Sequence, residues 1–247
     1  MATTPVPGFY GKMRGAGDFV QRRLPPDFLD VWDRNFSRAI AESRDLLCER
    51  WLPVYHASPA WRFLLSPGVC NDAAWAGVLA PSADRVGRCF PMMIGTRLAS
   101  GTRLPGVLYD GGRWFGAAER LAAAAQHDQR VNAQMFDQAV GALQVPAEPD
   151  EPTVPRLPES LDRDKRDYWL SLPDMTAPML AALWAHLAPG GCGLWWSAGN
   201  DAITSRVLVG RGLPTTEVFV AFLEAGSDVA MDRAQRRLGS LAPGMAS

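Results

Sequence analysis

Apolar residues recur every three or four positions in a stretch near the N-terminus, which is the spacing of one face of a helix. The members of this stripe are Phe28, Trp32, Phe36, Ile40 and Leu47. Pro25 and Pro26 stand at its beginning, and proline is well suited to the first turn of a helix. The pattern predicts a helix over residues 26–48.

Three later stretches also have helical spacing. Residues from about 117 to 140 place apolar side chains on one face and end near Gly141. Thr176 can cap a helix that runs to the Pro-Gly-Gly sequence at 189–191. The segment GLPTTEVFVAFL, residues 212–223, predicts a last short helix.

Shorter apolar runs predict strands. Trp61, Phe63 and Leu65 alternate with Arg62 and Ser66, a pattern typical of a half-buried strand. The runs 75–80 and 90–97 predict two strands joined by residues 81–89, and a second pair is expected at 193–199 and 206–210. Residues 101–112 have turn composition.

Helical and strand patterns interleave, which predicts an α/β fold with helices packed on a sheet. Two strand pairs have connections too short for crossovers, so we expect a mixed, largely antiparallel sheet. Trp195 and Trp196 are adjacent in a predicted strand and point to opposite faces. Either helices cover both faces, which gives a three-layer sandwich, or one ring is left for a partner.

A proline-rich connector divides the chain. Five prolines recur at three-residue spacing within residues 144–160: Pro146, Pro149, Pro152, Pro155 and Pro158. This spacing favours an extended strap over a helix. Because the roughly 87 residues that follow are few for an independent core, we expect a single domain over 1–247, with a tail that frays from about residue 233.

Composition and charge exclude several classes of protein. Hydrophobic residues make up 47% and charged residues 21% of the 247 positions, and the net charge is -1. This balance is typical of a globular protein and argues against a broad surface for nucleic acid or anionic membrane. No apolar stretch is long enough to span a membrane, and the N-terminal residues lead us to expect no secretory signal. Four scattered cysteines are expected to be reduced, so we expect a cytoplasmic protein.

No familiar catalytic constellation is present. The segment GKMRGAGDF is not a phosphate-binding loop, because Val6 stands where the first glycine is needed and Met13 follows Lys12. The three histidines lack metal-site spacing, and no nucleophile-elbow motif occurs. We therefore expect no cofactor and no metal.

The stretch AWAGVLAPSADRVGRCFP, residues 74–91, is unusual because charged residues interrupt an apolar run. The charges could be catalytic together with Asp18, could bind a partner, or could form the tip of a strand connection. The strand patterns favour the tip, in which the Asp84 carboxylate accepts backbone amides. Arg85 and Arg88 are then either braces of the loop or contacts for a partner.

Five segments in this order resemble the TagF (ImpM) family of type VI secretion-associated proteins over about residues 8–223. They read GFYGKMRGAGDFV, PAWRFLLSPGVC, WAGVLAPSADRVGRCFP, LWWS and GLP. The chain departs from the family pattern at Met13-Arg14, Ala83 and Cys89. The family-motif residues, structural or interacting, are Gly11, Lys12, Gly17, Asp18, Phe19, Trp61, Trp75, Gly77, Pro81, Ser82, Asp84, Arg85, Gly87, Arg88, Phe90, Pro91, Trp195 and Trp196.

This resemblance implies an α/β sandwich and a cytoplasmic accessory protein that is not an enzyme. It implies a post-translational repressor of secretion whose partner is the forkhead-associated scaffold protein of the type VI secretion system. No nucleic acid, membrane insertion, small-molecule substrate or catalytic residue is implied. An assembly chaperone of an apparatus subunit, and an enzyme that uses Asp18, Asp84, Arg85 and Arg88, remain alternatives.

Overall fold

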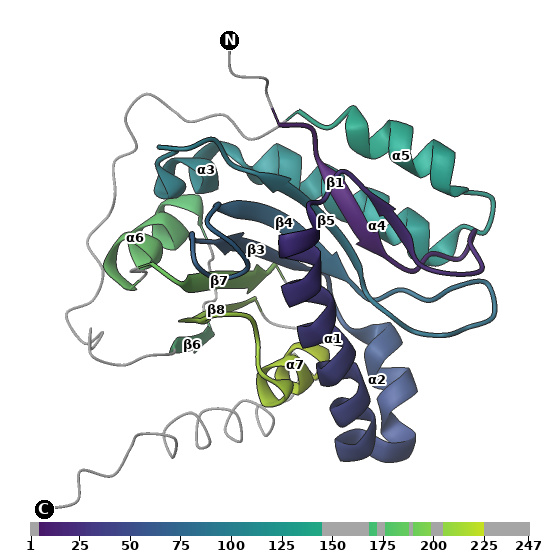
Figure 1. The fold of residues 1–247 in the computed structure, drawn as a ribbon. Helices are drawn as coiled ribbons and strands as arrows, with labels where there is room; N and C mark the ends of the chain where they lie inside the picture. The colour runs from purple at the N-terminus through teal and green to yellow at the C-terminus, as the bar shows by residue number, and fades with distance from the viewer. Residues whose placement is uncertain (1–4, 145–167, 172–175, 188–189, 199–204, 225–247) are drawn as a thin grey trace, which may run out of the picture.

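A computed structural model describes residues 5–144, 168–171, 176–187, 190–198 and 205–224 (Figure 1). The strands are β1 (Gly8–Gly11), β2 (Val20–Arg22), β3 (Trp61–Leu65), β4 (Trp75–Ala80), β5 (Met92–Arg97), β6 (Tyr168–Ser171), β7 (Cys192–Ser197) and β8 (Arg206–Arg211). The helices are α1 (Pro26–Leu47), η1 (Cys48–Arg50), α2 (Trp51–Ala57), α3 (Leu104–Asp110), α4 (Gly112–His127), α5 (Ala133–Gly141), α6 (Ala177–Leu187) and α7 (Thr216–Leu223).

The strands form one sheet in the order β2-β1-β5-β4-β3-β7-β8-β6. Every pairing among the described strands is antiparallel. The predicted α/β class and the antiparallel character of the sheet are thus confirmed. Because β7 pairs with β3, segments from both sides of the proline-rich connector contribute to the same sheet. The connector from residue 145 and the tail from residue 233 lie outside the described residues.

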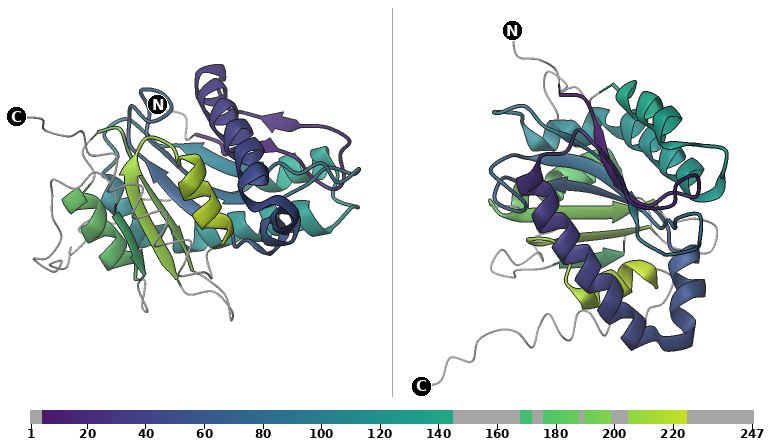
Figure 2. Two further views of the ribbon diagram at one scale, coloured as in Figure 1. Left: turned by 90° about the horizontal axis from the view of Figure 1, so that it is seen from below. Right: turned by 45° about the vertical axis from the view of Figure 1, so that its right-hand side comes forward.

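Alternate residues of the central strands belong to two hydrophobic clusters on opposite faces of the sheet. Phe63 and Trp195 join the cluster with α1, α2 and α7. Leu64 and Trp196 join the cluster with α4, α5 and α6. Figure 2 shows α1 and α7 on one side of the sheet and α4 on the other. Both tryptophan rings are therefore buried, and neither is left on the surface for a partner.

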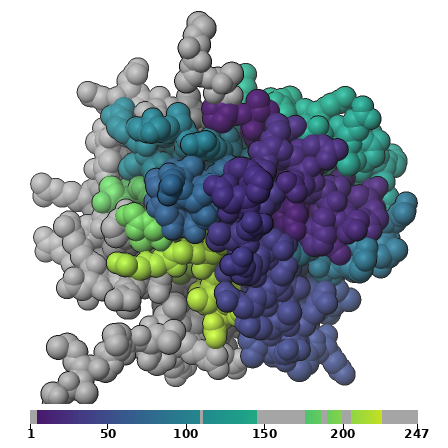
Figure 3. Space-filling view, viewed as in Figure 1, coloured from purple at the N-terminus to yellow at the C-terminus, as the bar shows by residue number. Residues whose placement is uncertain are grey.

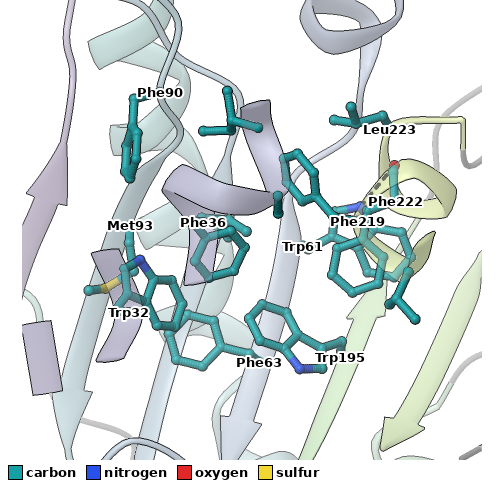
Figure 4. Packing of buried hydrophobic residues seen from close by; sticks show 14 of the residues in the cluster. Trp32, Phe36, Trp61, Phe63, Phe90, Met93, Trp195, Phe219, Phe222 and Leu223 are labelled. Atoms are coloured by element: carbon teal, nitrogen blue, oxygen red, sulfur yellow. Dashed lines mark hydrogen bonds between the residues drawn. The ribbon is translucent and has the colours of Figure 1, made fainter. Parts of the chain in front are cut away.

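Aromatic rings fill the first of these clusters (Figure 4). The Trp61 ring stacks on Phe222 of α7 with a centroid distance of 4.0 Å. Trp32 of α1 lies 5.2 Å from the Phe63 ring. Such contacts explain why α1 and α7 lie on this face, since large aromatic rings contribute most of the buried apolar area.

Two local predictions were wrong. The helix expected over 117–140 is divided into α4 and α5, because Asn132 caps a new helix by accepting a hydrogen bond from the Met135 amide at 2.9 Å. Residues 104–110 of the expected turn region form α3, with Pro105 in its first turn. Proline is compatible with a helix at that position.

Several elements were not predicted. These are β1 and β2 within the glycine-rich N-terminal segment, the short helix α2, and β6. The strand expected from Phe90 begins at Met92. Among the described helices, none combines the length and the apolar character that crossing a bilayer requires.

Candidate functional site

The connection between β4 and β5 ends in a tight turn around Asp84. Ala83 and Cys89 form an isolated antiparallel bridge below the turn. The Asp84 amide donates to the Arg88 carbonyl at 3.1 Å, and the Gly87 amide donates to the Asp84 carbonyl at 3.0 Å. Gly87 has a φ of 87°, which favours glycine. The charged residues of the motif therefore occupy the tip of a strand connection.

The Asp84 carboxylate is fully buried beneath this tip. Its Oδ1 atom accepts the backbone amides of Val86 at 3.1 Å and Arg88 at 2.9 Å. Its Oδ2 atom accepts Arg88 Nε at 2.7 Å and Lys12 Nζ at 3.1 Å. Burial by itself raises the pKa of this carboxyl, but these hydrogen bonds and the Lys12 charge outweigh it and lower the pKa to about 2. Asp84 is thus a charged structural residue.

A second loop, residues 12–19 between β1 and β2, is fastened to this turn. Arg88 Nη2 donates to the Gly17 carbonyl at 2.7 Å, and the Arg85 amide donates to the Ala16 carbonyl at 2.8 Å. We call residues 12–19 and 81–91 the loop pair. Figure 3 shows its purple N-terminal part and its teal-blue part side by side at the right-hand edge of the molecule. Segments about 70 residues apart thus form one surface.

The loop pair is also anchored on its inner side. The Tyr55 hydroxyl of α2 donates to the Ser82 carbonyl at 2.9 Å and accepts from the Ser82 amide at 3.0 Å. Burial raises the pKa of Tyr55 well above its usual value, so the phenol stays protonated and able to donate. Tyr55 was not among the predicted site residues, since a tyrosine in a loop-like YHASP segment has no distinguishing sequence signal.

The backbones of two further motif residues, Gly11 and Pro91, pack closely against each other. A β-carbon on Gly11 would lie 2.3 Å from the Pro91 carbonyl oxygen, and Gly11 has a φ of 148°. Only glycine allows the two backbones this close approach.

Phe19 covers part of the loop pair on its outer side. Its ring stacks on Tyr10 with a centroid distance of 5.3 Å and meets the edge of Phe90 at 4.8 Å. Lys12 Nζ lies 4.9 Å from the centre of the Phe19 ring, a favourable cation–π contact. Even so, 41% of Phe19 is exposed. The ring is thus held by three neighbours and still remains partly exposed.

The two arginines of the turn have different roles. Arg88 is a brace, because its guanidinium binds both Asp84 and Gly17. The Arg85 side chain is exposed and makes no hydrogen bond or ion pair within the described part of the chain. Val86 beside it is 71% exposed. The structure thus separates a bracing residue from two exposed ones, of which Arg85 lies close to Gly17 without bonding to it.

The other predicted positions do not join the loop pair. Trp61, Trp75, Trp195 and Trp196 lie in the core of the sheet. Gly77 lies there as well, since a β-carbon on it would come within 2.2 Å of a ring atom of Phe63. These residues hold the sheet together and have no evident part in a site.

Asp18 does not converge with Asp84 into an acid–base pair. Its carboxylate accepts the amide of its neighbour Phe19 at 2.8 Å. Both carboxylates of the enzyme hypothesis therefore bind backbone amides of their own loops. Hollows at α1, α2 and α7 are lined by residues other than the four charged ones of that hypothesis, although Pro81 and Pro91 of the loop pair line one of them.

Cys89 and His56 form the nearest approach to a reactive pair, with Sγ and Nε2 3.9 Å apart. Burial raises the pKa of the Cys89 thiol and lowers that of His56, which Arg14 lowers further. Both shifts favour the neutral forms over a thiolate–imidazolium pair. Within the ranges that the structure describes, no three potential ligands converge on a metal site.

Comparison with known proteins identifies the class. Residues 8–143, which include the whole loop pair, match the family described as TagF N-terminal domain, Type VI secretion system-associated. The chain therefore belongs to the TagF family. Among solved structures it is similar to PA0076 from Pseudomonas aeruginosa PAO1, with 35% sequence identity and a TM-score of 0.68 over 88% of this chain and 93% of that chain. No curated protein matches the chain.

Proposed function

We propose that this protein is a non-catalytic regulator of the type VI secretion system that acts in the cytoplasm as a post-translational repressor. In this proposal it binds the forkhead-associated scaffold protein of the system. Membership of the TagF family supports the association with type VI secretion.

The observation that supports a binding role is the set of hydrogen bonds that the Asp84 carboxylate accepts. All its hydrogen bonds go to donors of the loop pair, so its charge is used to shape a surface. A catalytic carboxylate needs a lone pair that can reach a substrate proton. A rigid loop with exposed arginine and apolar side chains is instead typical of protein interfaces.

The test is affinity purification of the tagged chain from a host with an intact secretion cluster. We expect the scaffold protein to be enriched over an untagged strain. Deletion of the gene should raise secretion while the amounts of the apparatus subunits stay the same. Overproduction should lower secretion without changing those amounts.

Two results would contradict this function. Absence of the scaffold protein from the purified material would contradict the proposed partner. A fall in the amount of one apparatus subunit after deletion, with co-purification of that subunit, would identify an assembly chaperone instead.

A further inference from the structure

We propose that Phe19, Arg85 and Val86, which we call the docking tip, form the contact surface for the forkhead-associated scaffold protein. The surface that they meet is an apolar pocket bordered by carboxylates. This inference rests on the proposed function and specifies which part of the chain performs it.

The first argument is the exposure of apolar side chains on the loop pair. Val86 is 71% exposed, the highest value among the large apolar side chains of the described residues, and Phe19 is 41% exposed. They lie on two loops that hydrogen bond to each other through Arg88 and Gly17. The tip of a turn is normally polar. An exposed valine there has no role in the packing of this chain.

The second argument is the rigidity of the support. Taking the charges of Lys12 and Asp84 out of water costs free energy, and a buried ion pair often adds little net stability. A turn between two strands can close without such a pair. What the pair and Arg88 do provide are two bonds that fasten the turn to residues 12–19 and so order the tip. A surface that is already ordered loses less entropy on binding.

The third argument is charge. The loop pair contains four cations and two carboxylates: Lys12, Arg14, Arg85, Arg88, Asp18 and Asp84. Lys12 and Arg88 share the single carboxylate of Asp84, and Arg85 has no counter-ion within the described residues. The loop pair thus carries a net positive charge in a chain whose net charge is -1. Positive potential favours an acidic partner surface and disfavours the same face of a second copy.

The experiment measures the affinity of the purified full-length chain for the purified scaffold protein by calorimetry. Arg85→Glu and Val86→Asp should each weaken binding by about tenfold or more. Arg38→Glu on α1 and Val6→Asp, which make the same changes at other exposed positions, should stay within about twofold. Raising the salt concentration from about 50 to about 300 mM should weaken wild-type binding more than that of Arg85→Gln.

Thermal midpoints of the two docking-tip variants should match that of the wild type, because neither side chain has a bonding partner within the described residues. Wild-type affinity in both variants, or a loss in Arg38→Glu alone, would overturn the docking tip and leave the proposed function standing. No binding by the wild-type chain would overturn the proposed function itself.

Discussion

The Nζ atom of Lys12 lies 3.1 Å from the Oδ2 atom of Asp84, and both side chains are buried although 72 residues separate them. This ion pair joins the end of β1 to the connection between β4 and β5. Removal of Asp84 would leave the buried Lys12 ammonium without its counter-ion, whereas Asp84 would keep Arg88 if Lys12 were removed. The two loops therefore adopt their conformations together.

Replacement of Asp84 by asparagine should destabilise the fold by about 3 kcal/mol, because Lys12 and Arg88 lose the charge that balances them. Urea unfolding followed by tryptophan fluorescence measures the change. Asp18→Asn is the matched control, and its cost should stay within about 0.5 kcal/mol because Asp18 is exposed. Equal effects of the two variants would contradict the structural role of Asp84.

Stability should depend on pH through the same carboxyl. Its pKa is about 2 in the folded protein, against an ordinary value of 3.8. The stability that it contributes is therefore fully present above about pH 4 and is lost as the pH falls toward 2. Urea unfolding between pH 5 and pH 2 should show the difference between wild type and Asp84→Asn shrinking as the solution becomes more acidic. A constant difference would contradict this prediction.

Three glycines should differ in how well they tolerate replacement by alanine. Gly77→Ala should cost about 3 kcal/mol, because its β-carbon would lie 2.2 Å from Phe63 and 2.5 Å from the Ile94 carbonyl oxygen. Gly87→Ala should cost about 1 kcal/mol, since its φ of 87° is strained for alanine although the space is open. Gly112→Ala, with open space in a helix, should cost nothing. Unfolding midpoints in urea would rank the three variants.

Trp195→Ala and Trp196→Ala should each cost about 3–5 kcal/mol, because each ring is buried on its own face of the sheet. Leu52→Ala is the control, and its half-exposed side chain should cost much less. A near-neutral result for one tryptophan would mean that its face of the sheet is open to solvent. Chemical unfolding monitored by circular dichroism suits this series.

One of the four cysteines should react with a thiol reagent much faster than the other three. Cys48 is exposed, whereas Cys70, Cys89 and Cys192 are buried. Burial raises the pKa of Cys70 to about 12 and also raises that of Cys89. A chromogenic disulfide reagent should therefore titrate about one thiol in the native protein and the others only after unfolding. Loss of the rapid phase in Cys48→Ser would confirm the assignment.

Periodicity predicted the elements that are long and have one clear pattern. The stripe from Phe28 to Leu47 gave α1, and the apolar run from Trp75 to Ala80 gave β4. The pattern failed where a single residue decides a boundary, as Asn132 does between α4 and α5. It failed for β1 and β2 as well, because short strands become ordered through pairing with neighbours distant in the sequence.

The sequence by itself determined that Asp84 sits in a turn with charged neighbours, since proline, glycine and aspartate carry local conformational preferences. It also determined the family, through motifs long enough to be specific. Only the tertiary structure decided which arginine braces the loop and which faces solvent. That distinction depends on Lys12 and Gly17, which reach the turn through the packing of β1 beside β5. Contacts of this kind depend on distance in space, and local sequence preferences do not encode them.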